Sequence, residues 1–383
     1  MQEIPFNRPF LTGKESSYLE KAVETGKISG NGVFSKKCHT RLVELFQCKK
    51  ALLTTSCTDA LEMAAILTEI KPGDEVIMPS FTFVSTANAF ILRGAKIVFV
   101  DSRPDHPGMD EEAIEELITP KTRAIVCVHY AGVACDMDKL VKIAEQYNLF
   151  LIEDAAQCID SYYQKDGAER KTLGSIGDLG TLSFHETKNI QSGEGGALLV
   201  NNPAFIDRSE IIWEKGTNRT AFWRGEIDKY GWVDIGSSFL PSELTAAFLF
   251  AQLEEVQTIQ KKRKRIWHSY NDELSPLMEK GLVRTPYIPE YATNNAHMYY
   301  LVCESLKQRT ELIAHLKKVG ISSVFHYQPL HKSSYFEAFC DERELKNTDT
   351  YGDCLVRLPM HLFLNQGAVE KVSHHIKEFF GEY

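Results

Sequence analysis

The chain has 383 residues, 43% of them hydrophobic and 25% charged, which is typical of a globular protein and long enough for two domains. Its net charge of −9 argues against a nucleic-acid-binding surface, since such surfaces are usually basic. No apolar run is long enough to cross a bilayer, so we expect no membrane association.

Nine cysteines are scattered along the chain without a CxxC pair or a Cys/His spacing that suits a metal. Their number is odd, and the first residues, Met1-Gln2-Glu3-Ile4-Pro5-Phe6, lack the pattern of a signal peptide. Free thiols in a reducing compartment are the simplest explanation. We therefore expect a cytoplasmic protein without a metal site.

Short apolar runs alternate with helical patterns from about residue 50 to 200. Such nearly continuous runs suit strands that are buried on both faces. The runs are 75–78, 96–101, 124–128, 150–154, 180–184 and 196–200, and helices are expected at 109–117 and 137–147. The alternation predicts an α/β fold with a mostly parallel sheet, in which ligands bind beyond the carboxyl ends of the strands.

A long helical pattern starts at Pro241-Ser242-Glu243 and runs to about Leu277. Strand signals are sparser after it. We expect strands at 298–302 and 322–327 and helices at 312–319 and 369–380. This predicts a large domain over residues 1–250 and a smaller α/β domain over 251–383, which the N-terminal segment joins.

Lys188 and Asp154 are the most informative pair of residues. Lys188 lies in Ser183-Phe184-His185-Glu186-Thr187-Lys188-Asn189, after a strand that ends in Glu153-Asp154-Ala155-Ala156-Gln157. Pyridoxal phosphate (PLP) needs a lysine to form a Schiff base with its aldehyde and an aspartate to keep its pyridine nitrogen protonated. Either residue alone says little, because such lysines are usually solvated and such aspartates are often turn residues.

A candidate phosphate loop precedes an amphipathic helix. Small hydroxyl residues in Thr54-Thr55-Ser56-Cys57-Thr58 would cap the helix, and the free amides there could hold a phosphate dianion. Taken alone, the segment is better explained as a plain cap. Ser183 is a second phosphate candidate, and the glycines of 191–196 would let the backbone approach a ligand.

These segments resemble the sugar aminotransferases of the DegT/DnrJ/EryC1/StrS family over nearly the whole chain, and the family has the type I fold of PLP enzymes. The segments that carry the resemblance are Thr55-Ser56-Cys57-Thr58, Pro79-Ser80-Phe81-Thr82-Phe83, 153–157, 183–189 and Gly193-Glu194-Gly195-Gly196. The resemblance implies that Lys188 forms the Schiff base, that Asp154 contacts the pyridinium and that Phe83 stacks on the ring. It further implies that Gln157 bonds the phenolic oxygen, and that Ser56, Cys57, Thr58 and Ser183 hold the phosphate.

Three further segments, 129–138, 214–219 and 234–238, resemble a branch of the family that makes dTDP-4-amino-4,6-dideoxygalactose for surface polysaccharides such as enterobacterial common antigen or O-antigen. This resemblance implies L-glutamate as amino donor and dTDP-4-keto-6-deoxyglucose as acceptor. It also implies a homodimer with shared active sites. No residue pattern fixes amination at C3 or C4, or the stereochemistry of the product, by physical reasoning.

A basic stretch, Lys215, Arg219, Arg224 and Lys229, could bind the substrate diphosphate. Lys215 and Arg219 lie in a matched segment, whereas a solvated surface explains Arg224 and Lys229 equally well. His326 and Tyr327 are candidates to contact the sugar, and His129 and His185 could equally be structural.

The chain departs from the family at one position of the expected site. Many members have an Asn followed two residues later by an Arg, where this chain has Ser238 and Leu240. In those members the Asn reaches the cofactor phosphate of the partner subunit, and Ser238 could still donate a hydrogen bond there.

Three other functions fit the sequence less well. A PLP-dependent sugar dehydratase of this fold has a histidine in place of the lysine, which Lys188 argues against. A nicotinamide-dependent oxidoreductase would need a GxGxxG turn after its first strand, and we find none. A PLP-binding regulator without catalysis would carry a DNA-binding segment or a basic face, and the chain shows neither.

Overall fold

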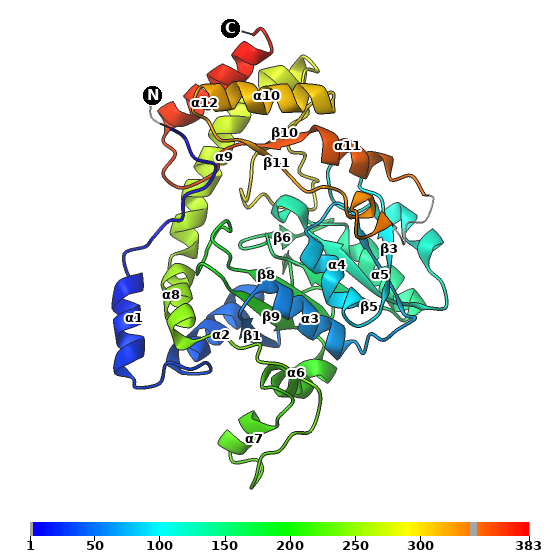
Figure 1. The fold of residues 1–383 in the computed structure, drawn as a ribbon, viewed down its shortest axis with the longest axis vertical. Helices are drawn as coiled ribbons and strands as arrows, with labels where there is room; N and C mark the ends of the chain where they lie inside the picture. The colour runs from blue at the N-terminus through cyan, green and yellow to red at the C-terminus, as the bar shows by residue number, and fades with distance from the viewer. Residues whose placement is uncertain (1–2, 338–342, 383) are drawn as a thin grey trace.

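A seven-stranded sheet forms the centre of the computed structural model, which describes residues 3–337 and 343–382 (Figure 1). The strand order is β1-β9-β8-β5-β4-β2-β3. The strands are β1 (Lys50–Thr54), β2 (Glu75–Pro79), β3 (Lys96–Val100), β4 (Thr122–Val128), β5 (Phe150–Asp154), β8 (Leu179–Ser183) and β9 (Gly196–Val200). Every neighbouring pair from β8 to β3 is parallel, while β9 is antiparallel to both β8 and β1. The mostly parallel sheet predicted from the apolar runs is confirmed.

Helices cover both faces of this sheet, as its apolar strands require. Successive strand residues point to opposite faces, so Ile77 belongs to one buried cluster and its neighbours Val76 and Met78 belong to the other. One face is covered by α2 (Val33–Phe46), α5 (Met137–Tyr147) and α8 (Glu243–Glu254), and the other by α3 (Cys57–Leu67), α4 (Val84–Ile91) and α6 (Ile206–Trp213).

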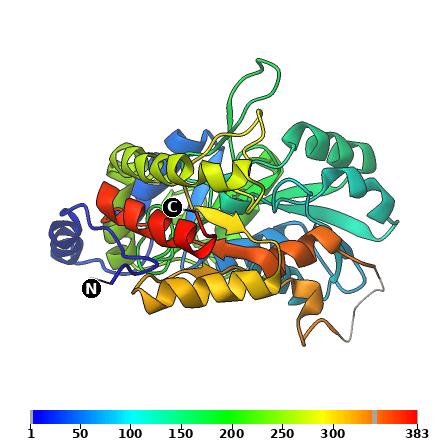
Figure 2. The ribbon, with the colours of Figure 1, turned by 90° about the horizontal axis from the view of Figure 1, so that it is seen from above.

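A second, three-stranded sheet follows in the C-terminal part. Its order is β10-β12-β11, with both pairs antiparallel. The strands are β10 (Tyr300–Val302), β11 (Val324–Phe325) and β12 (Leu355–Arg357), and the helices of this part are α9 (Val256–Glu279), α10 (Leu306–Lys318), α11 (Lys346–Cys354) and α12 (Gln366–Phe379). Figure 2 shows α9, α12 and α10 side by side, and a separate buried cluster lies between them and the small sheet.

The N-terminal segment reaches both parts of the chain. Ile4 forms a bridge with Ile321 beside the small sheet, and α1 (Glu15–Glu24) then packs along α8 (Figure 1). The predicted division at residue 250 falls inside α8, and the domain boundary stays a prediction. The short strands β6 (Tyr162–Tyr163) and β7 (Lys171–Thr172) form a separate hairpin. No helix among the described residues is both long and apolar enough to span a bilayer.

Two predicted helices were wrong in detail. Residues 109–117 form two short 3₁₀ turns, Glu111–Ala113 and Glu115–Leu117, rather than an α-helix. Four glutamates lie in this segment, and an α-helix would place Glu111 over Glu115 and Glu112 over Glu116, where like charges repel. The pattern from 241 to 277 is two helices, because the backbone leaves helical geometry at Glu255, between α8 and α9.

Candidate active site

A cavity of about 520 Å³ lies at the carboxyl ends of β4, β5 and β8, where the two sheets meet. Val128, Asp154 and Ser183, each the last residue of its strand, line one side. Phe325 and Arg357 line the other side from the small sheet. The cavity therefore lies where parallel α/β sheets bind their ligands.

Lys188 and Asp154 both line this cavity. Asp154 is buried and accepts hydrogen bonds from Thr86 Oγ1 at 2.7 Å and from the backbone N–H of Ala156 at 3.2 Å. Burial raises the pKa of Asp154 despite these bonds, and burial lowers the pKa of the Lys188 amine. An amine of lowered pKa beside a buried carboxylate can form a covalent bond with an aldehyde and can carry a proton.

The start of α3 forms one end of the cavity. Ser56 is the N-cap of this helix and its Oγ accepts from the N–H of Asp59 at 3.1 Å. The backbone of β9 lies against this turn, because a Cβ at Gly196 would come within 2.5 Å of the Cys57 nitrogen. Ser56, Cys57, Thr58 and Ser183 all line the cavity. The helix start thus presents its first amides and a hydroxyl group to an anion.

Gln157 and Tyr327 join the two walls of the cavity. Gln157 accepts from the N–H of Ala131 at 2.7 Å and donates from Nε2 to the Tyr327 hydroxyl at 3.3 Å. His326 stacks on Tyr327 with ring centroids 3.6 Å apart, and its Nδ1 lies 2.6 Å from the hydroxyl of Tyr130. Phe83 is the N-cap residue of α4; its side chain is 56% exposed and lines the same cavity. A planar ring could stack against such a face.

Three predicted site residues lie outside the cavity. Lys215, Arg219 and Ser238 belong to residues 214–238, which we call the arm, and the arm carries α7 (Arg219–Trp223) away from the sheet (Figure 1). All three are exposed, and Ser238 pairs with Glu214 in an isolated bridge. Within one chain, the arm therefore contributes nothing to the cavity.

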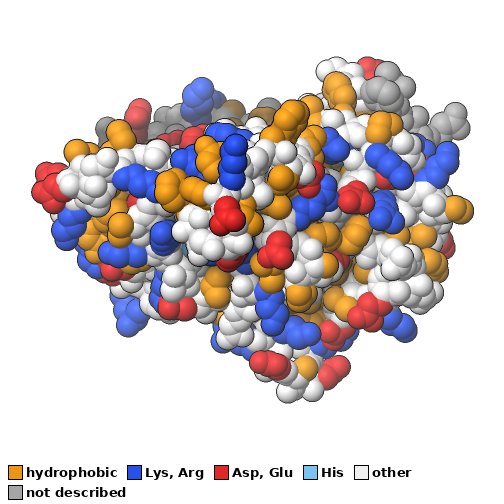
Figure 3. All heavy atoms as spheres, turned by 90° about the horizontal axis from the view of Figure 1, so that it is seen from below, with side chains coloured by type: hydrophobic (Ala, Val, Ile, Leu, Met, Phe, Trp, Pro, Cys, Tyr) orange, Lys and Arg blue, Asp and Glu red, His pale blue; other side chains and the backbone are white. Residues whose placement is uncertain are grey.

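The arm also exposes large aromatic side chains. Trp223 is 69% exposed and Trp232 is 81% exposed. Arg219 lies over the rings of Trp223 and Tyr230, at 5.8 and 5.9 Å from their centroids. Figure 3, which views the molecule from the α7 end, shows hydrophobic and basic side chains interspersed on this face.

The two histidines of uncertain role differ in position. His129 is fully buried, with its Nε2 at 2.9 Å from Glu153 Oε2, and it lies outside the cavity. Glu153 also accepts three backbone N–H bonds from 174–177, so this pair holds a buried turn together. His185 lines the cavity, and its Nδ1 lies 2.9 Å from the hydroxyl of Thr187.

Three residues that line the cavity were not expected from the sequence: Thr86, His297 and Arg357. Thr86 lies in the segment that follows β2, but nothing in the sequence indicated that its hydroxyl would bond Asp154. His297 and Arg357 carried no local signal, and Tyr130, which lies outside the cavity, bonds the lining residue His326. Asn189 and His297 share a 2.7 Å hydrogen bond next to Lys188, and this contact joins residues 108 positions apart.

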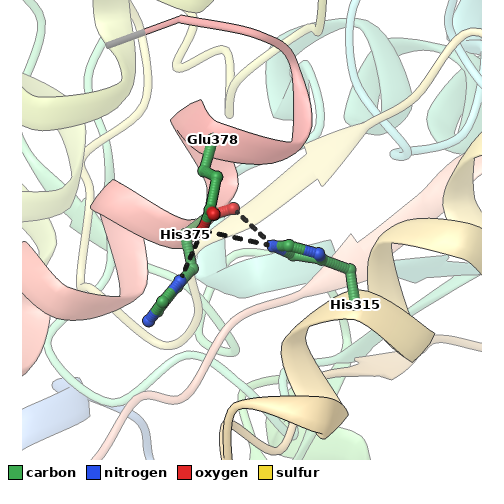
Figure 4. Close-up of side chains that lie close together, drawn as sticks. All are labelled: His315, His375 and Glu378. Carbon is green, nitrogen blue, oxygen red and sulfur yellow. Dashed lines mark hydrogen bonds and ion pairs between the residues drawn. The ribbon is translucent and has the colours of Figure 1, made fainter.

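One cluster outside the cavity has ligand types that suit a metal. His315 of α10 and His375 and Glu378 of α12 place their ligand atoms within 4.8 Å of one another, as Figure 4 shows. His375 Nδ1 lies 2.9 Å from Glu378 Oε2, and His315 Nε2 lies 3.1 Å from the carbonyl of His375. These contacts satisfy the polar atoms and connect α10 to α12 without an ion.

The sequence is similar to a known protein family and to individual relatives. The sequence profile described as the DegT/DnrJ/EryC1/StrS aminotransferase family matches residues 10–377. The chain belongs to this family. An uncharacterized protein of Methanocaldococcus jannaschii is 32% identical over 343 residues, which cover 87% of this chain and 86% of the relative. The GDP-perosamine synthase of Escherichia coli O157:H7 is 29% identical over 386 residues, with 100% of both chains covered.

Solved structures of similar proteins have the same fold. The protein Spr1654 of Streptococcus pneumoniae, assigned as a sugar aminotransferase and solved in its PMP form, has a TM-score of 0.88 and 26% identity. The match covers 99% of this chain and 98% of that one. The same protein was also solved in its PLP form. The chain is therefore a sugar aminotransferase of the type I fold, with pyridoxal phosphate as its cofactor.

The residues of the cavity fit this cofactor. Its phosphate needs amide and hydroxyl donors, and the Cβ-free approach of Gly196 leaves the start of α3 open to supply them. Its pyridine nitrogen needs a carboxylate, and Asp154 is buried and accepts from one hydroxyl and one amide among the described residues. Its aldehyde needs an amine, and Lys188 has no ion pair among residues 3–337 and 343–382.

Proposed function

We propose that the protein transfers the amino group of L-glutamate to C4 of dTDP-4-keto-6-deoxy-D-glucose, giving dTDP-4-amino-4,6-dideoxy-D-galactose for surface-polysaccharide synthesis. Amino transfer itself follows from the family. The choice of sugar rests on the three segments 129–138, 214–219 and 234–238, which resemble the branch that makes this product. We place the reaction in the cytoplasm, where the free cysteines of the described residues would stay reduced.

The observation that carries the proposed chemistry is the meeting of Lys188 and Asp154 in one cavity. We assign Lys188 as the covalent anchor of the cofactor and as the group that moves a proton to and from the reacting carbon, which its lowered pKa favours. When bound, the cofactor withdraws electrons from that carbon. Asp154 would hold the protonated pyridine nitrogen.

The remaining cofactor contacts follow from the positions of the side chains. We assign the amides of Ser56, Cys57 and Thr58, with the Ser183 hydroxyl, to the phosphate. Phe83 would stack on the ring and Gln157 would donate to its phenolic oxygen. Gln157 also donates to Tyr327, so these two residues would be positioned together.

We assign Lys215 and Arg219 to the substrate diphosphate, Ser238 to the cofactor phosphate, and His326 and Tyr327 to the sugar. The arm lies outside the cavity of its own chain, so its three residues could act only at the cavity of a second copy. This assignment therefore includes a homodimer with shared sites, and the exposed aromatic side chains of the arm suit burial in such an interface.

A second candidate keeps the chemistry and changes the sugar. The Escherichia coli relative is a GDP-perosamine synthase, which favours a GDP-linked 4-keto sugar. The gluco epimer of the product and a 3-amino sugar are further outcomes that the same residues could produce.

The test is to incubate the purified enzyme with L-glutamate and either dTDP-4-keto-6-deoxyglucose or a GDP-linked 4-keto-6-deoxyhexose. We expect product NMR to show an axial amine at C4 from the dTDP substrate, and no amino sugar with the Lys188→Ala variant. Conversion of the GDP substrate alone would replace the dTDP assignment. An equatorial C4 amine or an amine at C3 would replace the galacto assignment.

A further inference from the structure

Arg357 is a cation in the wall of the cavity, and no carboxylate of residues 3–337 and 343–382 forms an ion pair with it. It lies on β12, whose backbone pairs at this position with Tyr300 on one side and Val324 on the other, so its place is fixed by the small sheet. Its Nε is buried and has no hydrogen-bond partner in the part of the chain that the structure describes. A buried N–H without an acceptor costs free energy, so a ligand that supplied an acceptor would be stabilised.

The surroundings of Arg357 contain positive and neutral groups. The titratable groups that favour its charge are the phenols of Tyr130 and Tyr327, not carboxylates. Its charge in turn contributes, after burial, to the lowered pKa values of Lys188 and His326. This wall of the cavity therefore has a positive potential and few acceptors.

The geometry of the side chain suits a flat anion. The Arg357 guanidinium carbon lies 4.8 Å from the centroid of the Phe6 ring, and Phe6 lines the same cavity. Contact with an aromatic face orients a guanidinium and leaves its N–H edge available. Such an edge matches the two oxygens of a carboxylate.

We infer that Arg357 binds a carboxylate of the amino donor. The inference rests on the proposed use of L-glutamate, which must place its amine near Lys188 in the cavity that Arg357 lines. The other anionic groups of the reaction already have donors assigned to them. The start of α3 serves the cofactor phosphate, and the arm serves the substrate diphosphate. Arg357 is therefore the group that remains to hold a carboxylate of the donor.

The test measures binding rather than turnover. Glutarate has both carboxylates of glutamate but neither an amine nor a keto group, so it cannot react. We expect calorimetric titration of the holoenzyme with glutarate to give a dissociation constant that rises about 10- to 100-fold in Arg357→Gln. Arg357→Lys should lie between the two, because it keeps the charge and loses the two-point contact.

Three controls make the result decisive. Glutarate should raise the melting temperature of the wild type and leave that of Arg357→Gln unchanged, which shows whether the variant is folded and has lost only the ligand. Binding of dTDP should not change in either variant. The matched substitution is Arg284→Gln, which should leave glutarate binding unchanged. Arg284 is an exposed residue that donates to the carbonyl of Pro104.

The inference is overturned if glutarate binds Arg357→Gln as tightly as the wild type, if it binds neither protein, or if the variant loses dTDP instead. These outcomes are separate from the sugar test. An enzyme that aminates a different nucleotide sugar would still show Arg357-dependent binding of glutarate, whereas an enzyme that aminates the dTDP sugar but binds its donor carboxylate elsewhere would not.

Discussion

The cavity and the arm are the two regions that the proposed reaction needs, and the chain builds them differently. Around the cavity, polar side chains are fixed by bonds from distant elements, as Asp154 is by Thr86 and Gln157 is by Ala131. On the arm, Arg219 lies over two aromatic rings and Trp232 is 81% exposed. The polar contacts of the cavity form within a single chain, while the arm exposes the features of an interface.

The two regions correspond to two tasks, proton and amino transfer at the reacting carbon and binding of the substrate diphosphate. Groups that act on the reacting carbon gain from burial, because a low dielectric shifts their pKa values and strengthens their contacts. Groups that hold a diphosphate need only reach it with positive charge. Substitutions in the cavity should therefore change turnover, and substitutions on the arm should change the affinity for the sugar nucleotide.

The largest effect is expected for Lys188→Ala. Without the amine, the cofactor has no covalent anchor and the proton has no carrier, so kcat should fall by at least about 10⁴-fold. The measurement is single-turnover release of 2-oxoglutarate from L-glutamate, together with borohydride reduction and mass analysis of the cofactor-bearing peptide. Lys188→Arg, which keeps the charge but cannot form the bond, should be equally inactive. Residual activity near that of the wild type would remove Lys188 from the site.

Asp154→Asn should have the next largest effect. The amide keeps the size of the side chain and loses the charge, which removes a charge-assisted bond of about 1.5–3 kcal/mol. We expect kcat to fall about 10- to 100-fold, because the ring accepts electrons less well, with a shift in the visible absorbance of the bound cofactor.

The matched control for Asp154 is Thr86→Val, which removes the hydroxyl that donates to Asp154 at 2.7 Å and leaves the carboxylate in place. That loss is one ordinary hydrogen bond, about 1 kcal/mol, so kcat should fall only severalfold. If both variants were impaired equally, Asp154 would be acting through the structure of this wall rather than through its charge.

Much of the cavity could be predicted from the sequence because its signals are local. Apolar runs gave the strands, and Lys188 and Asp154 lie at or just beyond strand ends. Arg357 could not be found this way, because β12 has only three residues. In the sheet, Arg357 pairs with Tyr300 of β10 and Val324 of β11, which lie far away in the sequence. Such a strand is defined by its distant partners, which no local period reveals.

For the arm, the sequence identified candidate residues but not their position relative to the cavity. The resemblance identified Lys215, Arg219 and Ser238 as site residues, yet in one chain they lie outside the cavity. Residue types in a matched segment indicate chemistry but not which copy of the chain uses it. The turn itself is fixed by local sterics, since a Cβ at Gly216 would lie 1.9 Å from the carbonyl oxygen of Asp234.

Arg219→Ala tests the arm, with Arg224→Ala as its control. Arg224 donates to Glu210 at 2.7 Å and to Glu226 within its own chain, whereas Arg219 has no acidic partner among the described residues. We expect Arg219→Ala to raise the KM for the sugar nucleotide about tenfold with kcat nearly unchanged, and Arg224→Ala to change neither appreciably.

Mixing variants tests whether the arm acts across an interface. A dimer of one Lys188→Ala chain and one Arg219→Ala chain has one site with both residues intact only if Arg219 serves the partner's cavity. Activity at low sugar concentration should then exceed the sum of the two variants measured alone. Activity equal to that sum would return Arg219 to its own chain or remove it from the site.

The smallest effect concerns the junction between the two regions. His39 of α2 is half-buried, with its ring edge-on to Trp213 at the end of α6, just before the arm. Its Nε2 accepts from the N–H of Leu53 at 3.0 Å, which requires the neutral ring. Burial, and then the charge of Lys50, lower the pKa of His39 from its usual 6.5 to about 4.

The sign of the pH effect follows from that shift. Between pH 6.5 and 4 the unfolded chain binds a proton that the folded chain does not, so this contribution to stability is present above pH 6.5 and is lost as the pH falls. Allowing for partial exposure of the ring, we expect His39 to account for about 1–2 kcal/mol of the decrease in unfolding free energy.

The His39→Gln variant, which can still accept from Leu53, should show an unfolding free energy, measured with urea, that changes less with pH across this range. His374→Gln, at an exposed histidine of α12, should reproduce the wild-type profile. If the unfolding free energy of His39→Gln fell with pH as steeply as that of the wild type, groups other than His39 would cause the loss of stability in acid.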